Sequence, residues 1–242
     1  MELSIFQKGF NYSQDGPGNR LVYHLQGCNL RCPWCSNPEG LSPQGGVRYT
    51  TEALCQEALQ CRPMFFDGGG VTLTGGEVTM QMDAVRELLC QLREAGIHTA
   101  IETNGIHKGL PELFSLVDYL IMDCKQYDPE RHRQVTGDSN QVALENLAKA
   151  LEAGLRPAVR IPLIGGFNAT EADAKGFAQL FCSMPNWEQM TVELLPYHEY
   201  GKDKYPACGL TYTMTEAARV SPQTVKSFQQ ILSDAGLTVI HT

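Results

Sequence analysis

The chain is short of positive charge and has no long apolar run. Its 19 Lys and Arg residues are outnumbered by 27 Asp and Glu residues, which gives a net charge of -8 over 242 residues. Proteins that bind nucleic acid usually carry a basic balance or a basic patch, so neither DNA nor RNA is expected as a partner. No stretch approaches 18 apolar residues, and Met1–Phe6 lacks the basic-then-apolar pattern of a signal peptide. We therefore expect a cytoplasmic protein without a membrane span.

The cysteines do not form a plausible disulfide framework. There are nine of them, an odd number with uneven spacing, and no secretory context accompanies them. In a reducing cytoplasm, thiols are more often buried or bound to metal than oxidised.

The sequence also lacks repeats and low-complexity segments, and its apolar pattern alternates between strands and helices. Expected strands are 21–26, 71–74, 97–102, 119–123, 158–163 and 190–195. Between them, apolar residues recur at three- and four-residue steps, as in Met82, Val85, Leu89 and Leu92. Such alternation implies parallel strands joined by crossover helices. We expect an α/β fold, an incomplete (β/α)6-type barrel of parallel strands with outer helices, formed by residues 1–242 as a single domain.

Helix ends are marked by recognisable residues. Thr170 and Asp173 have the spacing of a capping pair, and Pro222 and Gly236 bracket the last apolar helix pattern.

The strongest chemical signal is the loop Cys28–Cys35, which places three cysteines (Cys28, Cys32 and Cys35) within eight residues. Thiolates are soft ligands that suit iron–sulfur clusters or zinc. A four-iron cluster normally takes four thiolates, so three in one loop would leave one iron for a ligand that is not protein. The alternatives are a zinc site, which would normally show two pairs of cysteines, and an iron–sulfur electron carrier, which would normally bring four ligands.

The spacing Cys-x3-Cys-x2-Cys, with Trp34 before the last cysteine, resembles the signature of the radical S-adenosylmethionine superfamily. This resemblance implies a [4Fe-4S] cluster held by Cys28, Cys32 and Cys35, with S-adenosylmethionine on the open iron. One electron from the cluster would cleave S-adenosylmethionine and yield a 5′-deoxyadenosyl radical. The cluster and S-adenosylmethionine would carry the chemistry, so no catalytic side chain is assigned.

Further motifs resemble one branch of that superfamily, the glycyl-radical-enzyme activases, whose best-known member activates pyruvate formate-lyase. They occur in the family's order over almost the whole chain. These motifs are Asp15–Gly18 with Arg20, Thr72–Glu77, Glu102–Gly105, Met122–Lys125, Gly137–Asn140, Arg160–Leu163 and Leu194–His198. The resemblance implies that the chain removes hydrogen from a glycine of a partner glycyl radical enzyme, and that Asp15–Gly18 helps to clasp that glycine loop.

The same resemblance implies which residues meet S-adenosylmethionine. The expected contacts are Trp34, Cys35, Ser36, Gly76, Glu77, Asp123, Cys124, Lys125, Arg160 and His198. Taken alone, several of these residues have ordinary explanations. The glycines could form a tight turn, Asp123 and Lys125 could form a salt bridge, and Cys124 could be a buried thiol. Arg160 could form an ion pair with another residue, and His198 could be a structural histidine.

A monovalent-cation site is also implied, at Glu102, Thr103 and Asp123. Glu102 stands where the family pattern has aspartate, and its side chain is one methylene longer, which puts the coordination geometry in question.

One departure from the activase pattern narrows the set of activases that the chain resembles. Cys35–Glu39 resembles activases of dehydratase- and lyase-type enzymes, many of which carry a ferredoxin-like insert with eight cysteines after this loop. Only Cys55 and Cys61 lie between the loop and Val71 here, so we expect one cluster and no insert.

The expected partners are a glycyl radical enzyme and a flavodoxin- or ferredoxin-like electron donor, and the chain is expected to be a monomer. Three other functions remain open: a ribonucleotide-reductase activase, a radical enzyme with a small-molecule substrate, and a non-catalytic iron–sulfur or zinc protein. The segment Pro196–Lys202 favours the activase.

Overall fold

A computed structural model of the chain describes residues 1–241. It divides into two compact units. The N-terminal unit comprises Met1–Asn29, Asn37–Thr103 and Gly109–Ile121, and the C-terminal unit comprises Leu30–Ser36, Asn104–Lys108 and Met122–Thr242.

The N-terminal unit is built on a sheet that begins with antiparallel strands and continues with parallel ones. Its strands are β1 (Glu2–Tyr12), β2 (Asn19–Leu25), β3 (Val47–Thr50), β4 (Gly70–Gly75), β5 (Thr99–Thr103) and most of β6 (Tyr119–Asp123). β1 pairs antiparallel with β2 and β3, whereas β2, β4 and β5 run parallel. Nearly every position of β2 and β4 is buried, as expected for strands covered on both faces.

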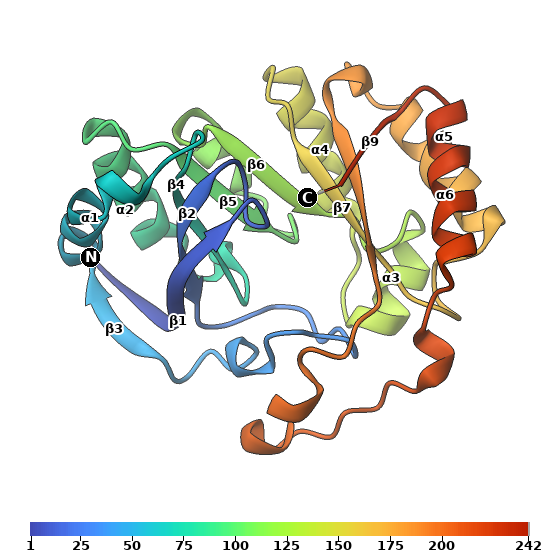
Figure 1. Ribbon diagram of the computed structural model, residues 1–242, viewed down its shortest axis with the longest axis horizontal. Helices are drawn as coiled ribbons and strands as arrows, with labels where there is room; N and C mark the ends of the chain where they lie inside the picture. Colours follow the sequence, from blue (N-terminus) through green and yellow to red (C-terminus); the bar gives the residue numbers. More distant parts are fainter. Residues whose placement is uncertain (242) are drawn as a thin grey trace. The chain divides into compact units, whose positions relative to one another are not determined.

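Two α-helices pack against each other in this unit, α1 (Thr51–Gln60) and α2 (Met82–Glu94), and Figure 1 shows them side by side. Each turns a short apolar face inward; in α2 this face includes Val85, Leu89 and Leu92. Four 3-10 helices complete the unit: Pro38–Gly40, Arg62–Met64, Val78–Gln81 and Leu110–Leu116.

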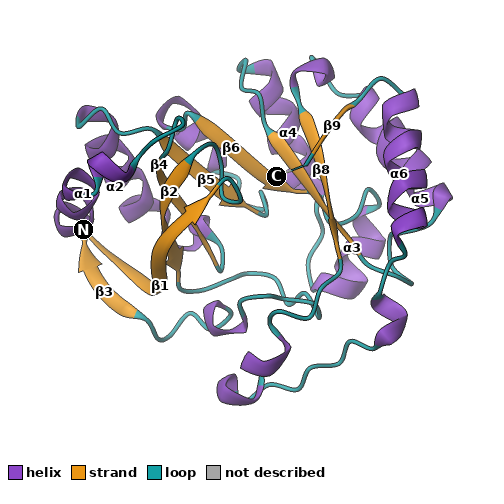
Figure 2. Ribbon diagram, viewed as in Figure 1, coloured by secondary structure: helices purple, strands orange, loops and turns teal. Residues whose placement is uncertain are grey.

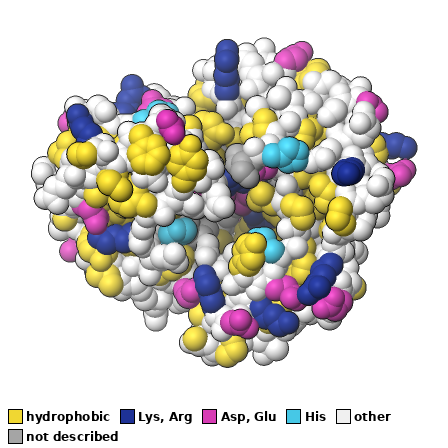
Figure 3. All heavy atoms as spheres, viewed as in Figure 1, with side chains coloured by type: hydrophobic (Ala, Val, Ile, Leu, Met, Phe, Trp, Pro, Cys, Tyr) yellow, Lys and Arg dark blue, Asp and Glu magenta, His cyan; other side chains and the backbone are white. Residues whose placement is uncertain are grey.

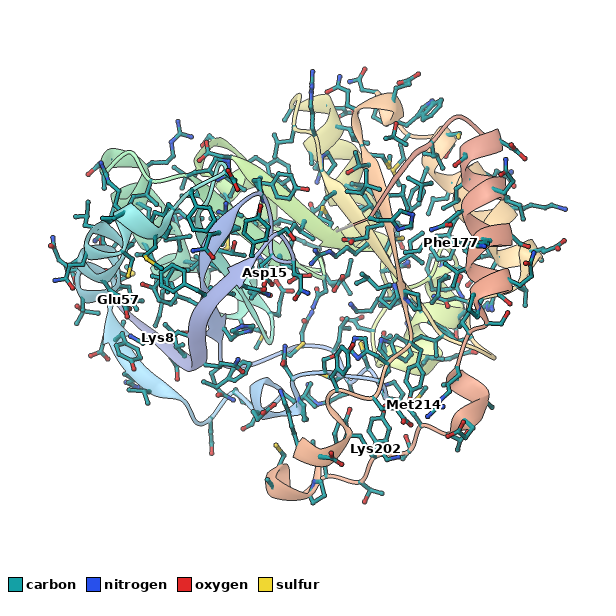
Figure 4. All side chains as sticks on the ribbon, viewed as in Figure 1. Lys8, Asp15, Glu57, Phe177, Lys202 and Met214 are labelled. Atoms are coloured by element: carbon teal, nitrogen blue, oxygen red, sulfur yellow. The ribbon has the colours of Figure 1, made fainter. Side chains whose placement is uncertain are left out.

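The C-terminal unit begins at the end of β6 and continues through parallel strands joined by helices. Its elements are α3 (Pro129–Thr136), α4 (Gln141–Glu152), β7 (Ala158–Leu163), α5 (Glu171–Cys182), β8 (Thr191–Pro196), α6 (Pro222–Asp234) and β9 (Thr238–Ile240). β8 pairs parallel with β7 and with β9. The ring of Phe177 on α5 lies 6.0 Å from that of Phe228 on α6, and these two helices pack together (Figure 4).

Between β8 and α6 the chain is mostly loop, as Figure 2 shows, with short 3-10 helices at Lys202–Lys204, Pro206–Cys208 and Glu216–Ala218. A further 3-10 helix, Trp187–Gln189, precedes β8.

The strand order is β3-β1-β2-β4-β5-β6-β7-β8-β9, with β3 and β9 at the two ends, so the sheet is open. The expected α/β fold of mostly parallel strands with crossover helices is confirmed. No residue motif predicted the antiparallel β1, which turns into β2 through a short loop that contains Gly16 and Gly18, both at positive φ. A short connection of this kind joins antiparallel strands, whereas parallel strands need a long crossover.

Within residues 1–241, the structure contains no helix that is both long enough and apolar enough to cross a bilayer. On the face drawn in Figure 3, basic side chains lie singly or beside acidic ones.

Candidate functional site

The three-cysteine loop leaves the end of β2, and its parts belong to different units. Cys28 lies in the N-terminal unit, and Cys32 and Cys35 lie in the C-terminal unit. All three are half-buried, and none forms a disulfide. The loop backbone is fixed by the Arg31 N–H, which donates to the Thr136 carbonyl at 2.8 Å, and by a turn in which the Cys35 N–H donates to the Cys32 carbonyl at 3.2 Å.

Residues 1–241 contain no group of three or more His, Cys, Asp or Glu side chains arranged to hold a metal ion. The assignment of Cys28, Cys32 and Cys35 as cluster ligands therefore depends on their spacing in the sequence and on the chemistry of their thiols.

Trp34 is partly buried and packs against a small apolar cluster of the C-terminal unit. Its ring centroid is 5.2 Å from that of Phe167, and Ile164 and Ala218 are buried in the same cluster. The sequence predicts that Trp34 contacts S-adenosylmethionine, and this packing fixes the position of its ring.

Ser36 and Cys35 are contacted through their backbone. The Lys204 ammonium donates to the Ser36 carbonyl at 3.1 Å, and the Tyr205 hydroxyl donates to the Cys35 carbonyl at 3.3 Å. Burial raises the pKa of Tyr205 to about 12, so its hydroxyl is protonated at neutral pH and acts as a donor. Nothing in the spacing of the sequence pointed to these two residues.

The glycines at the end of β4 are required by close backbone contacts. A Cβ on Gly76 would lie 2.2 Å from the Gly27 carbonyl oxygen, and one on Gly75 would lie 2.2 Å from the Leu25 nitrogen. The Gly76 N–H donates to the Leu25 carbonyl at 2.8 Å, and the Glu77 N–H donates to the Gly27 carbonyl at 2.7 Å. These contacts connect the segment directly to the chain that leads into Cys28.

Glu77 is 2% exposed and its carboxylate accepts several hydrogen bonds. Oε1 accepts from the Thr79 N–H at 3.0 Å, from the Thr79 hydroxyl at 2.7 Å and from the Thr103 hydroxyl at 2.6 Å. Glu102, the neighbour of Thr103, accepts from the Thr74 hydroxyl at 2.9 Å. The N-terminal unit thus gathers Glu77, Glu102 and Thr103 at the ends of β4 and β5, where parallel α/β folds usually carry function.

Asp123 and Lys125 meet at the end of β6 in the C-terminal unit. The Lys125 ammonium lies 2.6 Å from Asp123 Oδ2, and the two side chains are 10% and 21% exposed respectively. The backbone of Lys125 is held by Asn168, whose side-chain amide donates to its carbonyl at 2.8 Å. Sequence reasoning missed Asn168, because only tertiary contact brings it to Lys125.

Cys124, between these two charges, is a buried thiol. Burial raises its pKa to about 12, so it carries its proton at neutral pH. It faces a small cavity whose lining includes Asn140, Leu147 and Val159. Its environment is that of an inert core thiol.

Arg160 pairs with Glu193 on the neighbouring strand. The two residues are register partners of β7 and β8, and Arg160 Nε lies 2.8 Å from Glu193 Oε2. Their side chains are 8% and 4% exposed. The ion pair that competed with a cofactor contact in sequence reasoning is therefore present.

His198 follows β8 and stacks on Tyr200, with ring centroids 4.1 Å apart and planes inclined by 24°. Burial lowers the pKa of His198, so the ring is neutral at pH 7. Nδ1 accepts from the Tyr200 N–H at 3.4 Å, which places the proton of the neutral ring on Nε2.

The Asp15–Gly18 turn is organised by Arg20, whose side chain is fully buried. Its guanidinium donates to the Pro17 carbonyl at 3.1 Å and to the Val71 carbonyl at 2.7 Å, and the Thr72 hydroxyl donates to the Asp15 carbonyl at 2.7 Å. Burial lowers the pKa of Arg20 to about 10, which still leaves it charged at neutral pH. Arg20 therefore holds the turn from inside the N-terminal unit.

Comparison with known proteins gives consistent results. The model of the Radical SAM superfamily matches residues 22–181. The pyruvate formate-lyase-activating enzyme of Clostridium pasteurianum is 33% identical over 91% of this chain and 92% of its own length. The choline trimethylamine-lyase activating enzyme of Oleidesulfovibrio alaskensis is 32% identical over 82% of this chain and 84% of its own.

Among solved structures, a domain of pyruvate-formate lyase-activating enzyme from Bacteroides vulgatus superposes with a TM-score of 0.58 at 29% sequence identity. The match covers 72% of this chain and 98% of that one.

Proposed function

Because the chain belongs to the radical SAM superfamily and, within it, to the glycyl-radical-enzyme activases, we propose that it removes a hydrogen atom from a glycine of a partner glycyl radical enzyme. The observation that carries this proposal is the similarity to two named activating enzymes over at least 82% of the chain, with the three-cysteine loop inside the matched region.

The cofactors of this family are a [4Fe-4S] cluster and S-adenosylmethionine. The donor set fits them: the loop offers three thiols, which are half-buried and form no disulfide, and thiolates are the ligands that iron–sulfur clusters take. Cys28, Cys32 and Cys35 would hold the cluster. When bound, the two cofactors supply the electron and the carbon radical that the reaction needs.

The chain's own residues would bind and orient S-adenosylmethionine. Gly76 would offer backbone without a side chain, and the carboxylate of Glu77 would accept from the cofactor's ammonium group. Asp123 and Lys125 present a charged pair at a strand end, and His198 presents a neutral ring with a donor at Nε2. Trp34 and Ser36 would line the adenine side, and Cys124 would close the floor of the site.

Arg160 and the cation donors already have partners within the chain. The Arg160 guanidinium is engaged with Glu193, so a cofactor carboxylate would be a further partner. Glu102, Thr103 and Asp123 are the oxygen donors proposed for a monovalent cation, in keeping with the preference of hard cations for oxygen.

We further propose that a flavodoxin- or ferredoxin-like protein supplies electrons, that the chain works as a monomer in the cytoplasm, and that residues 1–242 form one radical S-adenosylmethionine domain without a ferredoxin-like insert.

The test of the chemistry is anaerobic. The protein is reconstituted with iron and sulfide and reduced with dithionite, its electron paramagnetic resonance is recorded with and without S-adenosylmethionine, and 5′-deoxyadenosine is assayed. We expect a four-iron signal that changes on adding S-adenosylmethionine, with deoxyadenosine formed by the parent and by Cys90→Ala but not by Cys32→Ala. Cys90 is a matched control, since it is another half-buried thiol outside the loop. Zinc in place of iron, or a signal indifferent to S-adenosylmethionine, would refute the proposal.

The test of the substrate uses candidate glycyl radical enzymes from the same organism. A doublet glycyl-radical resonance on one of them is the expected result. Active cleavage of S-adenosylmethionine with no radical on any of them would refute this substrate class and favour a small-molecule substrate.

A further inference from the structure

A short segment after β8, Gly201–Tyr205, lies directly on the backbone of the three-cysteine loop within the C-terminal unit. The Tyr205 hydroxyl donates to the Pro33 carbonyl at 3.2 Å and to the Cys35 carbonyl at 3.3 Å. The Lys204 ammonium donates to the Ser36 carbonyl at 3.1 Å. Three of the four carbonyls from Pro33 to Ser36 are therefore bound by two side chains about 170 residues away in sequence.

Gly201 allows this close approach. A Cβ at this position would lie 2.3 Å from the Cys35 carbonyl oxygen and 2.9 Å from the Ser36 Cα. The backbone of Gly201 has φ of -84°, which any residue can adopt. Glycine is needed here for space, and what occupies that space is the backbone beside a proposed cluster ligand.

The segment is itself held firmly. Tyr205 is 5% exposed, and its ring packs edge-on against Tyr212 with centroids 4.9 Å apart. The hydroxyl of Tyr212 lies 2.6 Å from that of Tyr197, and the Tyr197 N–H donates to the Leu163 carbonyl at 3.0 Å. The contacts on the loop are thus connected to the ends of β7 and β8.

We propose that Gly201, Lys204 and Tyr205 form a carbonyl clamp, which positions the loop that carries Cys32 and Cys35 and thereby governs retention and reduction potential of the cluster. This inference rests on the proposed function, because it requires those cysteines to be cluster ligands. The three residues are positioning residues, since they contact the backbone of the loop.

The physical reason lies in the peptide groups. All peptide bonds of the described chain are trans, so a carbonyl held by the clamp directs the N–H of the same peptide to the opposite side. The clamp therefore fixes the directions of the Trp34 and Ser36 N–H groups. Hydrogen bonds to cluster sulfurs and nearby charge both tune the potential of an iron–sulfur cluster. The Lys204 cation favours the reduced, more negative state.

The test compares two pairs of variants in the reconstituted protein. Tyr205→Phe removes the hydroxyl that binds two carbonyls, and Tyr23→Phe is its control, since the hydroxyl of this buried tyrosine also donates to a backbone carbonyl, that of Leu54 in the N-terminal unit. Lys204→Met removes the cation on the loop, and Lys202→Met is its control, because Lys202 (labelled in Figure 4) is half-exposed and pairs with Glu199.

Two readouts do not depend on activity. One is the rate at which an iron chelator strips the cluster under anaerobic conditions, and the other is the midpoint potential from a redox titration followed by paramagnetic resonance. We expect Tyr205→Phe to lose iron up to about tenfold faster than Tyr23→Phe, the factor that corresponds to one or two lost hydrogen bonds. We expect Lys204→Met to lower the midpoint potential relative to both the parent and Lys202→Met.

Iron loss and potentials that are the same in each variant and its control would overturn the clamp while leaving the proposed function intact. A parent protein that takes up zinc instead of a four-iron cluster would overturn both. Hydrogen exchange of residues 31–37 in the loaded protein gives a second measure, in which Tyr205→Phe speeds exchange of the loop amides and Tyr23→Phe does not.

Discussion

Removing one charge from the buried pair Arg160–Glu193 is the sharpest test of the C-terminal unit. Glu193→Gln keeps the size of the side chain and an acceptor oxygen but removes the negative charge. Because the two side chains are 8% and 4% exposed, the Arg160 cation would be left with little water to replace its partner. Breaking a buried pair in this way costs ~3–5 kcal/mol, and the acceptor that remains in Gln reduces the expected loss to ~2–3 kcal/mol.

The measurement is the urea midpoint of unfolding, taken anaerobically at equal cluster loading, since bound cofactors shift apparent stability. The double variant Arg160→Met/Glu193→Leu is the matched comparison. It removes both charges and replaces them with apolar groups of similar volume, so it should recover most of the loss. A Glu193→Gln protein within ~0.5 kcal/mol of the parent would show that the pair is solvated and would refute the reasoning.

The same variants decide what else Arg160 does. If its guanidinium also holds the carboxylate of S-adenosylmethionine, Arg160→Met should weaken binding of that cofactor much more than Glu193→Gln does. If the ion pair is its only role, both variants should lose stability and keep their affinity. Equilibrium binding measured on protein that is still folded separates these outcomes.

Three other substitutions or conditions have definite expected outcomes. Arg20→Lys should lower the free energy of unfolding by ~2–4 kcal/mol, because lysine cannot replace the guanidinium at several buried acceptors at once; urea unfolding measures this, and an unchanged midpoint would contradict it. Burial raises the pKa of Cys124 to about 12, so in native protein at pH 7.5 iodoacetamide should leave this thiol unmodified until the chain is unfolded, as peptide mass spectrometry would report. Burial lowers the pKa of His132 in the folded protein. As the pH falls through ~6.5, this histidine therefore takes up a proton more readily in the unfolded chain than in the folded one, which favours unfolding. The urea midpoint should therefore fall between pH 7.5 and 5.5, and less steeply in His132→Gln.

Much of the fold could be predicted because its strands and helices carry strong local patterns. β6 and β7 have the predicted bounds, and α5 begins with the predicted capping box at Thr170 and Asp173. β1 escaped prediction because only Leu3 and Ile5 of its eleven residues are buried, which leaves no clear alternation. α1 escaped for a related reason, since its buried face consists of Leu54 and a few small side chains.

The candidate site divides in the same way between local and distant information. The order and identity of Glu77, Asp123 and Lys125 follow from motifs, and their places at strand ends follow from the alternation of elements. Their immediate partners do not follow, because Thr103 is 26 residues from Glu77 and Asn168 is 43 residues from Lys125. A buried carboxylate must find donors somewhere, but sequence spacing does not say which residues provide them.

The carbonyl clamp is the strongest case of this limit. A cluster ligand can be recognised from spacing, since one short loop must wrap one inorganic core. The groups that orient that loop act through its backbone carbonyls, and any donor at the right point in space can bind a carbonyl. Lys204 and Tyr205 thus leave no signature of their own at the loop, and Lys202, two residues away, looks equivalent in sequence although it points to Glu199. The different behaviour expected of Lys204→Met and Lys202→Met is therefore a direct test of tertiary structure, because nothing in the local sequence distinguishes the two lysines.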